Sequence, residues 1–406
     1  MFAIFFLAMA WKSNDALSNP QFWAEDATIF FAQQLGSLLP QIFVPYAGYL
    51  HATPRLIAWF ASFFSLEFSP LIYNFMAVLI AAGAMALTCR RLQGYIPVPV
   101  VVLSFLLVPT NGEIFGTITN SQWFLQFWLA ACCITPGRAP RGVWGWLRDA
   151  ALLIVCITGP FSILLACVVV GLAISSATCR KLKWDPFEGA LSRFTSDSDW
   201  RALAILGVGA VVQFVIFINF SPQNQAATQP VLSLLSLTFG QVLPLHTFGT
   251  LPLNQAAWLL VDCALIALLL FCRRTPGSAR LVIASFVCFA FVETFVSVRL
   301  KEVGPMAQFM IGDRYFYLPK IAWWWMVWHV VAMIDRQRPY MATLLVSAGL
   351  ILVAALNTSH LRRPALVDMH WRENVTQLDA PGSYVVPFNP GGWNLLIEVR
   401  AKKEEP

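Results

Sequence analysis

Long apolar runs that are almost free of charged residues recur along the whole chain. A soluble core needs polar surface to cover it, yet 58% of the residues are hydrophobic and 12% are charged, against roughly 45–50% and 25% in soluble domains. The same composition excludes a disordered chain. We therefore expect an all-α polytopic membrane protein. Its candidate spans are Leu71–Cys89, Ile96–Thr110, Trp123–Thr135, Leu203–Phe220, Ala256–Cys272, Leu281–Val298, Ile321–Ile334 and Met341–Leu356.

Two further apolar stretches are less regular. Ala150–Ser176 is interrupted by Thr158-Gly159-Pro160, and glycine and proline break a single helix. We expect two short spans or a re-entrant pair here, and a broken helix of this kind is tolerated where it lines a cavity. Phe2–Trp11 is short for a span, and counting it gives about 11 transmembrane helices.

The basic residues predict the orientation. They fall in alternate short loops, which the positive-inside rule places in the cytoplasm. This leaves outer loops at 13–67, 111–121, 221–255 and 299–320, a transmembrane domain over 1–357, and a small outer C-terminal segment over 358–406 with β-rich character. The net charge of +6 thus reflects topology, and we expect membrane lipids rather than nucleic acid as partners. The basic groups are Arg90/Arg91, Arg138/Arg141/Arg148, Arg180/Lys181/Lys183, Arg273/Arg274/Arg280 and Arg336/Arg338.

Two adjacent acids, Glu25 and Asp26, stand in the first outer loop. Carboxylates at a membrane surface suit general-base work on a hydroxyl, or metal binding. Asp26 shares a helical stripe with Phe22 and Phe30, and apolar surroundings raise the basicity of a carboxylate. We therefore expect Asp26 to be catalytic with Glu25 as its helper. The alternative is that the pair only complements the dipole at a helix N-terminus.

The remaining candidates for substrate binding come from all parts of the expected outer surface. Guanidinium groups match phosphate geometry, and a basic, tyrosine-rich patch in the last outer loop suits a lipid phosphate. Arg314 and Lys320 are open to a second interpretation as interfacial anchors, Glu113 as a helix cap, and His51 and His246 as packed side chains. The candidate binding residues are Arg314, Tyr315, Tyr317, Arg299, Lys301, Arg55, Tyr49, His51, Glu113 and Asn120.

At these residues the chain resembles the polytopic glycosyltransferases of the GT-C fold, which use polyprenyl-phosphate sugars on the outer face of the membrane. The resemblance rests on Glu25-Asp26 after the first hydrophobic segment, on Arg314-Tyr315-Phe316-Tyr317-Leu318-Pro319, and on the number of spans. It implies transfer of a sugar to an envelope glycan or glycolipid at the outer face of a bacterial inner membrane. It also implies a first-loop carboxylate as base or metal ligand, and it leaves a divalent metal open.

Two other classes compete with this interpretation. A polysaccharide polymerase or ligase such as one for O-antigen would also bind polyprenyl-linked sugars with outer arginines, but through a diphosphate. A lipid or solute transporter would need polar groups along a path through the bilayer, where only Asp262 and Glu293 are available. We therefore expect a transferase.

Overall fold

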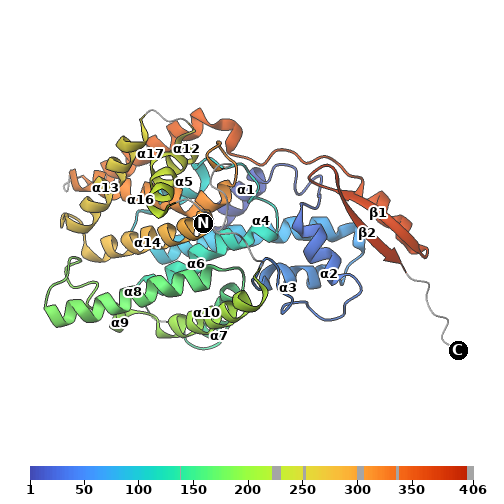
Figure 1. The fold of residues 1–406 in the computed structure, drawn as a ribbon, viewed down its shortest axis with the longest axis horizontal. Helices are drawn as coiled ribbons and strands as arrows, with labels where there is room; N and C mark the ends of the chain where they lie inside the picture. Colours follow the sequence, from blue (N-terminus) through green and yellow to red (C-terminus); the bar gives the residue numbers. More distant parts are fainter. Residues whose placement is uncertain (138, 222–229, 250–252, 300–305, 335–337, 400–406) are drawn as a thin grey trace.

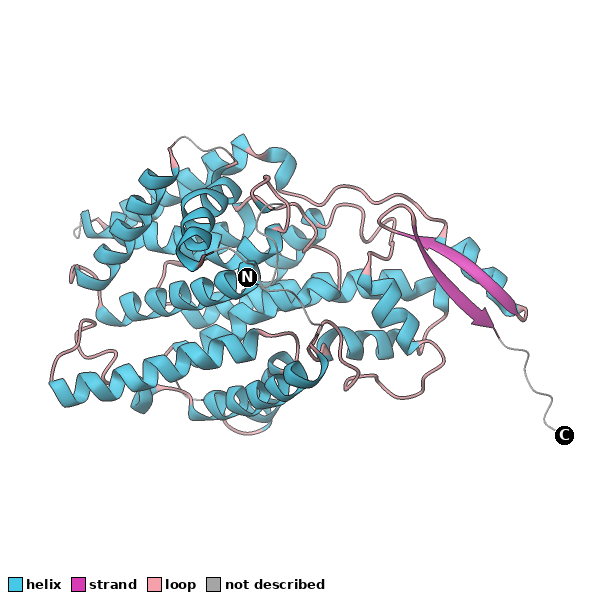
Figure 2. Ribbon diagram, in the orientation of Figure 1, coloured by secondary structure: helices cyan, strands magenta, loops and turns pink. Residues whose placement is uncertain are grey.

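The computed structural model describes residues 1–137, 139–221, 230–249, 253–299, 306–334 and 338–399, and helices dominate it (Figure 2). The longer helices run along the long axis of the molecule, and the two strands lie at one end of it (Figure 1). The main helices are α1 (Phe2–Lys12), α3 (Ala52–Ala61), α4 (Ser69–Leu92), α5 (Val98–Leu107), α6 (Gln122–Ile134), α7 (Val143–Cys156), α8 (Phe161–Leu182), α10 (Trp200–Phe220), α11 (Val231–Leu237), α12 (Leu243–Phe248), α13 (Gln255–Phe271), α14 (Gly277–Arg299), α16 (Tyr317–Ile334) and α17 (Pro339–Leu356). The short elements are η1 (Asp26–Phe31), α2 (Ala32–Gln34), η2 (Leu66–Phe68), η3 (Thr119–Ser121), α9 (Phe194–Asp197), η4 (Thr238–Val242), η5 (Asp313–Phe316), η6 (Thr358–His360), α18 (Trp371–Thr376) and η7 (Gln377–Asp379).

Within the described residues, five helices are long and apolar enough to cross a bilayer. They are Leu66–Leu92, Phe161–Leu182, Trp200–Phe220, Val231–Phe248 and Gly277–Arg299. Shorter apolar helices, such as the ten residues of α5, rise only about 15 Å at 1.5 Å per residue, half the hydrocarbon thickness of about 30 Å. The helical, multi-pass character is therefore confirmed, whereas the number of about 11 spans stays a prediction.

One of the long apolar helices lies where we expected an outer loop. The segment Val231–Phe248 falls inside the range 221–255 and runs through α11, the π-turn η4 and α12. This helix was not predicted because Gly240 and Pro244 interrupt the apolar pattern of the segment and no charged residues flank it. Pro244 sits in the first turn of α12, directly after the π-turn, where a helix tolerates proline.

The break at Thr158-Gly159-Pro160 is confirmed, since α7 ends at Cys156 and α8 begins at Phe161. Gly159 has φ +77°, and a Cβ there would lie 1.8 Å from Oε1 of Gln122. Buried Gln213 on α10 holds the break to the first outer segment. Its amide donates to Leu50 O at 3.0 Å and to Gly159 O at 2.9 Å, and its oxygen accepts from Leu50 N at 2.9 Å.

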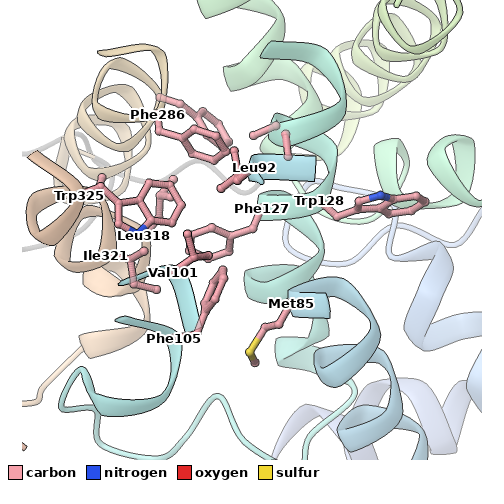
Figure 3. Close-up of a cluster of buried hydrophobic side chains, with 14 of the residues drawn as sticks. Met85, Leu92, Val101, Phe105, Phe127, Trp128, Phe286, Leu318, Ile321 and Trp325 are labelled. Carbon is pink, nitrogen blue, oxygen red and sulfur yellow. The ribbon is translucent and has the colours of Figure 1, made fainter. Parts of the chain in front are cut away.

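A large apolar core joins α4, α5, α6, α14 and α16 (Figure 3). Phe105 packs edge-on against Phe127 at 4.9 Å between ring centroids, and Phe286 packs edge-on against Trp325 at 5.1 Å. The indole of Trp325 also donates to the hydroxyl of Ser104 at 3.1 Å. Because these helices are locked together, the segments that connect their ends are held in fixed relative positions.

The expected outer C-terminal appendage contains a two-stranded sheet. Strands β1 (Gly382–Phe388) and β2 (Trp393–Val399) pair antiparallel, with Phe388 opposite Trp393. Their inner face joins a second apolar cluster that includes Phe22 and Trp371, whose rings lie 4.7 Å apart. The C-terminal segment thus packs on the first outer segment, beside α2 and α3 (Figure 1).

Candidate functional site

A cavity of about 630 Å³ lies where the segments that we expect to be outer loops meet one end of α8, α10 and α14. One side is apolar, and we call it the apolar wall. It is formed by Leu164 of α8, Phe217 and Ile218 of α10, and Val296 of α14. The other sides carry carboxylate, guanidinium, imidazole, phenol and amide groups. As expected, the broken helix lines this cavity, through Pro160, Phe161 and Leu164.

The two adjacent acids face different surroundings. Glu25 lines the cavity, and its carboxylate accepts a hydrogen bond from the hydroxyl of Tyr46 at 3.3 Å. Asp26 is 0% exposed and does not line the cavity. Its two oxygens accept from Ile118 N at 3.1 Å, Thr119 N at 3.0 Å and the Thr119 hydroxyl at 2.5 Å. Asp26 therefore fixes the turn at 118–119, while Glu25 is the member of the pair that a ligand can reach.

Burial and hydrogen bonding act on Asp26 in opposite directions. Burial raises its pKa to about 7, against the hydrogen bonds from Thr119 and Ile118, which lower it. The expected rise in basicity is thus present, but on a carboxylate without exposed surface. Glu25 and Asp26 stand at the N-terminus of η1, and neither caps it with a side-chain hydrogen bond, so the alternative that the pair complements a helix dipole remains open.

A tight turn brings Tyr46, Tyr49 and His51 to the cavity. Tyr46 and Tyr49 exchange backbone hydrogen bonds of 2.9 and 3.0 Å around Ala47 and Gly48, both of which have positive φ. Tyr49 stacks on Phe217 with 5.4 Å between ring centroids. His51 is buried, which lowers its pKa to about 4, so its imidazole is neutral near pH 7 and Nδ1 lies 3.1 Å from Tyr49 O.

Arg314 and Tyr315 bring the segment between α14 and α16 to the same cavity. The Arg314 side chain is 27% exposed and pairs with Glu113, and its guanidinium lies 5.2 Å from the centroid of the Tyr315 ring. Glu113 is held in turn by Asn111, whose amide lies 3.4 Å from Oε2. Asn120 also lines the cavity, and its amide donates to Glu113 O at 2.9 Å.

The residue before Arg314 anchors this segment inside the protein. Asp313 is 0% exposed, and its Oδ1 accepts from Lys320 at 2.7 Å and lies 2.8 Å from Nδ1 of His246. Lys320 also donates to Pro109 O at 2.6 Å. We call His246, Asp313 and Lys320 the buried clamp. Its position shows that His246 is packed and that Lys320 is not an exposed interfacial anchor.

Other predicted residues lie elsewhere. Tyr317 is buried in the core, where its hydroxyl donates to Phe105 O at 3.1 Å. Arg55 is buried over the Phe30 ring at 5.1 Å and donates to Val44 O at 3.1 Å. Arg299 ends α14 without lining the cavity, and Lys301 lies outside the described residues.

The sequence interpretation missed several residues that line the cavity. Tyr46 could have been found, because it mirrors Tyr49 across an Ala-Gly turn. Gln122, Trp123 and Glu293 also line the cavity, and we call them the polar wall. Glu293 could have been weighted more heavily, since a carboxylate inside an apolar run is costly unless it is used.

Asp262, the other intramembrane acid, has a structural partner. Its carboxylate accepts a hydrogen bond from the indole of Trp323 on α16 at 3.0 Å, which links α13 to α16. Across the described ranges, no group of three His, Cys, Asp or Glu side chains is placed to hold a metal ion. The nine cysteines are all free.

Comparison with known proteins adds no relative. No protein-family model, no curated protein and no solved structure matches this chain. The resemblance to GT-C glycosyltransferases therefore stays a prediction.

Proposed function

We propose that the protein is an integral-membrane glycosyltransferase that moves a sugar from a polyprenyl-phosphate donor to an envelope glycan or glycolipid. One observation carries the proposal. A single cavity joins a carboxylate, Glu25, a guanidinium, Arg314, and a wall of apolar side chains from three helices that are long enough to span a membrane. A lipid-linked sugar phosphate carries a hydroxyl-rich group, an anion and an apolar tail, which are the complements of these three surfaces.

The donor phosphate is assigned to Arg314. Its guanidinium is aimed by Glu113 and stacked on Tyr315, and arginine binds phosphate with paired N–H donors. The lipid tail follows the apolar wall, where Phe217 and Ile218 of α10 continue towards the exposed apolar side of that helix, which includes Phe214 and Phe220.

Glu25 is the carboxylate that we assign to proton transfer. The acceptor oxygen attacks the anomeric carbon, the bond from that carbon to the phosphate oxygen breaks, polyprenyl phosphate leaves, and the acceptor proton passes to Glu25. A positioned base contributes typically 10²–10⁴-fold to such a step. Asp26 holds the turn that carries Thr119 and Asn120, so its role is positioning.

We place the cavity on the outer face of a bacterial inner membrane, because the basic loops alternate with the segments that build the cavity. Cysteine substitutions test this orientation. Ser37→Cys and Ser383→Cys should react with an impermeant thiol reagent in intact cells or spheroplasts. Ser196→Cys, on the exposed surface between Arg193 and Arg201, should react only after the membrane is broken. The opposite pattern contradicts the orientation.

The function itself is tested by ligand stabilisation and by product. The purified protein in detergent is heated with undecaprenyl phosphate, with the same lipid carrying one sugar from a panel, and with diphosphate-linked glycans. A ligand that binds the folded state raises Tm, and we expect the monophosphate sugars to do so and to be consumed when acceptor glycolipids are added. A response to diphosphate-linked glycans alone favours a polymerase or ligase, and binding without turnover favours a transporter.

A further inference from the structure

The polar wall contains buried polar atoms that the protein itself leaves without partners. Glu293 is 0% exposed and Trp123 is 6% exposed, and both line the cavity. Oε1 of Glu293 lies 3.5 Å from the amide of Gln126. Oε2 of Glu293, the indole N–H of Trp123 and Oε1 of Gln122 have no hydrogen-bond partner in the described part of the protein.

Such atoms are unfavourable unless something satisfies them. Buried polar groups in folded proteins are nearly always hydrogen-bonded, and a carboxylate on a membrane-spanning helix is costlier still. Here the unpartnered atoms belong to three side chains that line one cavity. The arrangement therefore points to a ligand that supplies the missing partners.

The chemistry of the three atoms restricts that ligand. Oε1 of Gln122 needs a hydrogen-bond donor, the indole N–H of Trp123 needs an acceptor, and the carboxyl group of Glu293 needs a partner for Oε2. A phosphate offers only acceptors and leaves the oxygen of Gln122 without a donor, and a metal ion or ammonium group offers nothing to the indole. A hydroxyl is both donor and acceptor, so neighbouring hydroxyls on one ring satisfy all three atoms.

We propose that the polar wall, Gln122 with Trp123 and Glu293, is a subsite for a polyhydroxylated sugar ring. This inference rests on the proposed function and identifies the residues that recognise the sugar. The position agrees with it, because the Trp123 ring packs edge-on against Tyr315 at 5.5 Å and Tyr315 lies under Arg314. A sugar joined directly to a phosphate at Arg314 therefore lies next to this wall.

The test compares lipids with and without a sugar. Tm of the purified protein is titrated with undecaprenyl phosphate and with the same lipid carrying glucose, galactose, mannose or arabinose, and the sugar increment is the difference in affinity between the two. Glu293→Gln replaces the carboxyl group at constant size, and we expect it to reduce the increment about tenfold, as for the loss of one hydrogen bond that leaves a buried group unsatisfied. Trp123→Phe keeps the ring contacts with Tyr315 and Phe161 but removes the N–H, and should reduce the increment less.

Two controls separate this inference from the proposed function. Arg314→Ala should weaken binding of both lipids, with or without the sugar. Asp262→Asn should leave the affinity for both lipids unchanged, because its carboxylate is hydrogen-bonded to Trp323 and lies in a separate groove. If the wild type responds to neither lipid, the proposed function fails.

The outcome for Glu293 then decides the inference. A sugar increment that survives in both Glu293→Gln and Trp123→Phe overturns it, while the donor assignment at Arg314 stands. If the wild type shows no increment, free mono- and oligosaccharides are titrated in the presence of undecaprenyl phosphate. Stabilisation that Glu293→Gln abolishes assigns the wall to the acceptor's sugar, and no such response overturns the inference.

Discussion

The buried clamp and the polar wall both contain an acid with no exposed surface, but the partners of the two carboxyl groups differ. In the clamp, Asp313 lies between Lys320 and His246, so a cation inside the protein compensates the carboxylate. One oxygen of Asp313 also lacks a partner among the described residues, but the clamp does not line the cavity. In the polar wall, Glu293 has one long amide contact and faces the cavity. Burial alone therefore does not mark a functional acid, and our proposal for Glu293 rests on burial at a cavity without a compensating partner.

The same contrast separates the neighbouring residues Glu25 and Asp26. Asp26 is enclosed by hydrogen bonds from 118–119, and Glu25 opens into the cavity beside Tyr46. Substitutions can tell these two kinds of acid apart. Some change a residue that is held by partners inside the protein, and the others change a residue that faces the cavity.

The largest effect is expected at Glu25. Glu25→Gln keeps the size of the side chain but removes the base, so turnover should fall roughly 10²–10⁴-fold while donor affinity stays near that of the wild type. Initial rates of sugar transfer from labelled donor measure the turnover. Asp26→Asn is the matched variant and should affect folding more than the chemical step. Loss of turnover in Asp26→Asn alone, with donor binding and Tm intact, would return the catalytic role to Asp26.

The next effect concerns stability at the clamp. Asp313→Ala leaves Lys320 buried without its anion, and breaking a buried ion pair in this way costs about 3–5 kcal/mol. Thermal unfolding in detergent should show a strongly lowered Tm. The double variant Asp313→Ala/Lys320→Met should regain most of the lost stability, because both charges are then gone. Glu67→Ala breaks an exposed pair with Arg372 and should cost only about 0–1 kcal/mol; an equal loss in both single variants would contradict the clamp.

A smaller effect is expected at Arg314. Charge-assisted contacts contribute roughly 1.5–3 kcal/mol, so both Arg314→Ala and Arg314→Lys should weaken donor binding about tenfold or more, since lysine lacks the planar pair of donors. Titration of Tm with polyprenyl-phosphate sugar measures the affinity, and Arg372→Ala, an exposed arginine at the appendage, serves as the control. Unchanged affinity in Arg314→Ala would make it an interfacial anchor.

The sequence predicted some features well because they are local. Apolar runs, the Thr158-Gly159-Pro160 break and the alternating strands near the C-terminus each depend on neighbouring residues, and each has its counterpart in the structure. The helix at 231–248 was missed because the π-turn that accommodates Pro244 has no sequence signature.

The site was harder to predict because its roles depend on distant partners. The apolar stripe around Asp26 indicated burial correctly, but nothing in the first loop could show that residues 118–119 enclose its carboxylate. Glu293 and Trp123 likewise gain their meaning only when α6 and α14 meet at one cavity. Six of the predicted residues nevertheless line that cavity, namely Glu25, Tyr49, His51, Asn120, Arg314 and Tyr315.

The last expected effect is a pH dependence that only a difference between variants reveals. Burial raises the pKa of Asp26 from 3.8 to about 7. Between about pH 4 and pH 7 the unfolded chain therefore loses this proton while the folded protein keeps it, so the contribution of Asp26 to stability declines as the pH rises and is flat above 7. His51 acts in the opposite direction, because burial lowers its pKa from 6.5 to about 4 and it favours the folded state as the pH rises from 4 to 6.5.

The two residues offset each other in the wild type, so we compare it with Asp26→Asn, which keeps His51 and cannot titrate at position 26. The Tm of the wild type minus that of Asp26→Asn should decrease from pH 4.5 to pH 7 and then stay constant. Tryptophan fluorescence during heating measures both proteins in one detergent. A difference that is level over this whole range would mean that the hydrogen bonds from Thr119 and Ile118 keep Asp26 ionised in the folded protein. Its charge would then be held as firmly as that of Asp313, by groups inside the protein rather than by a ligand in the cavity.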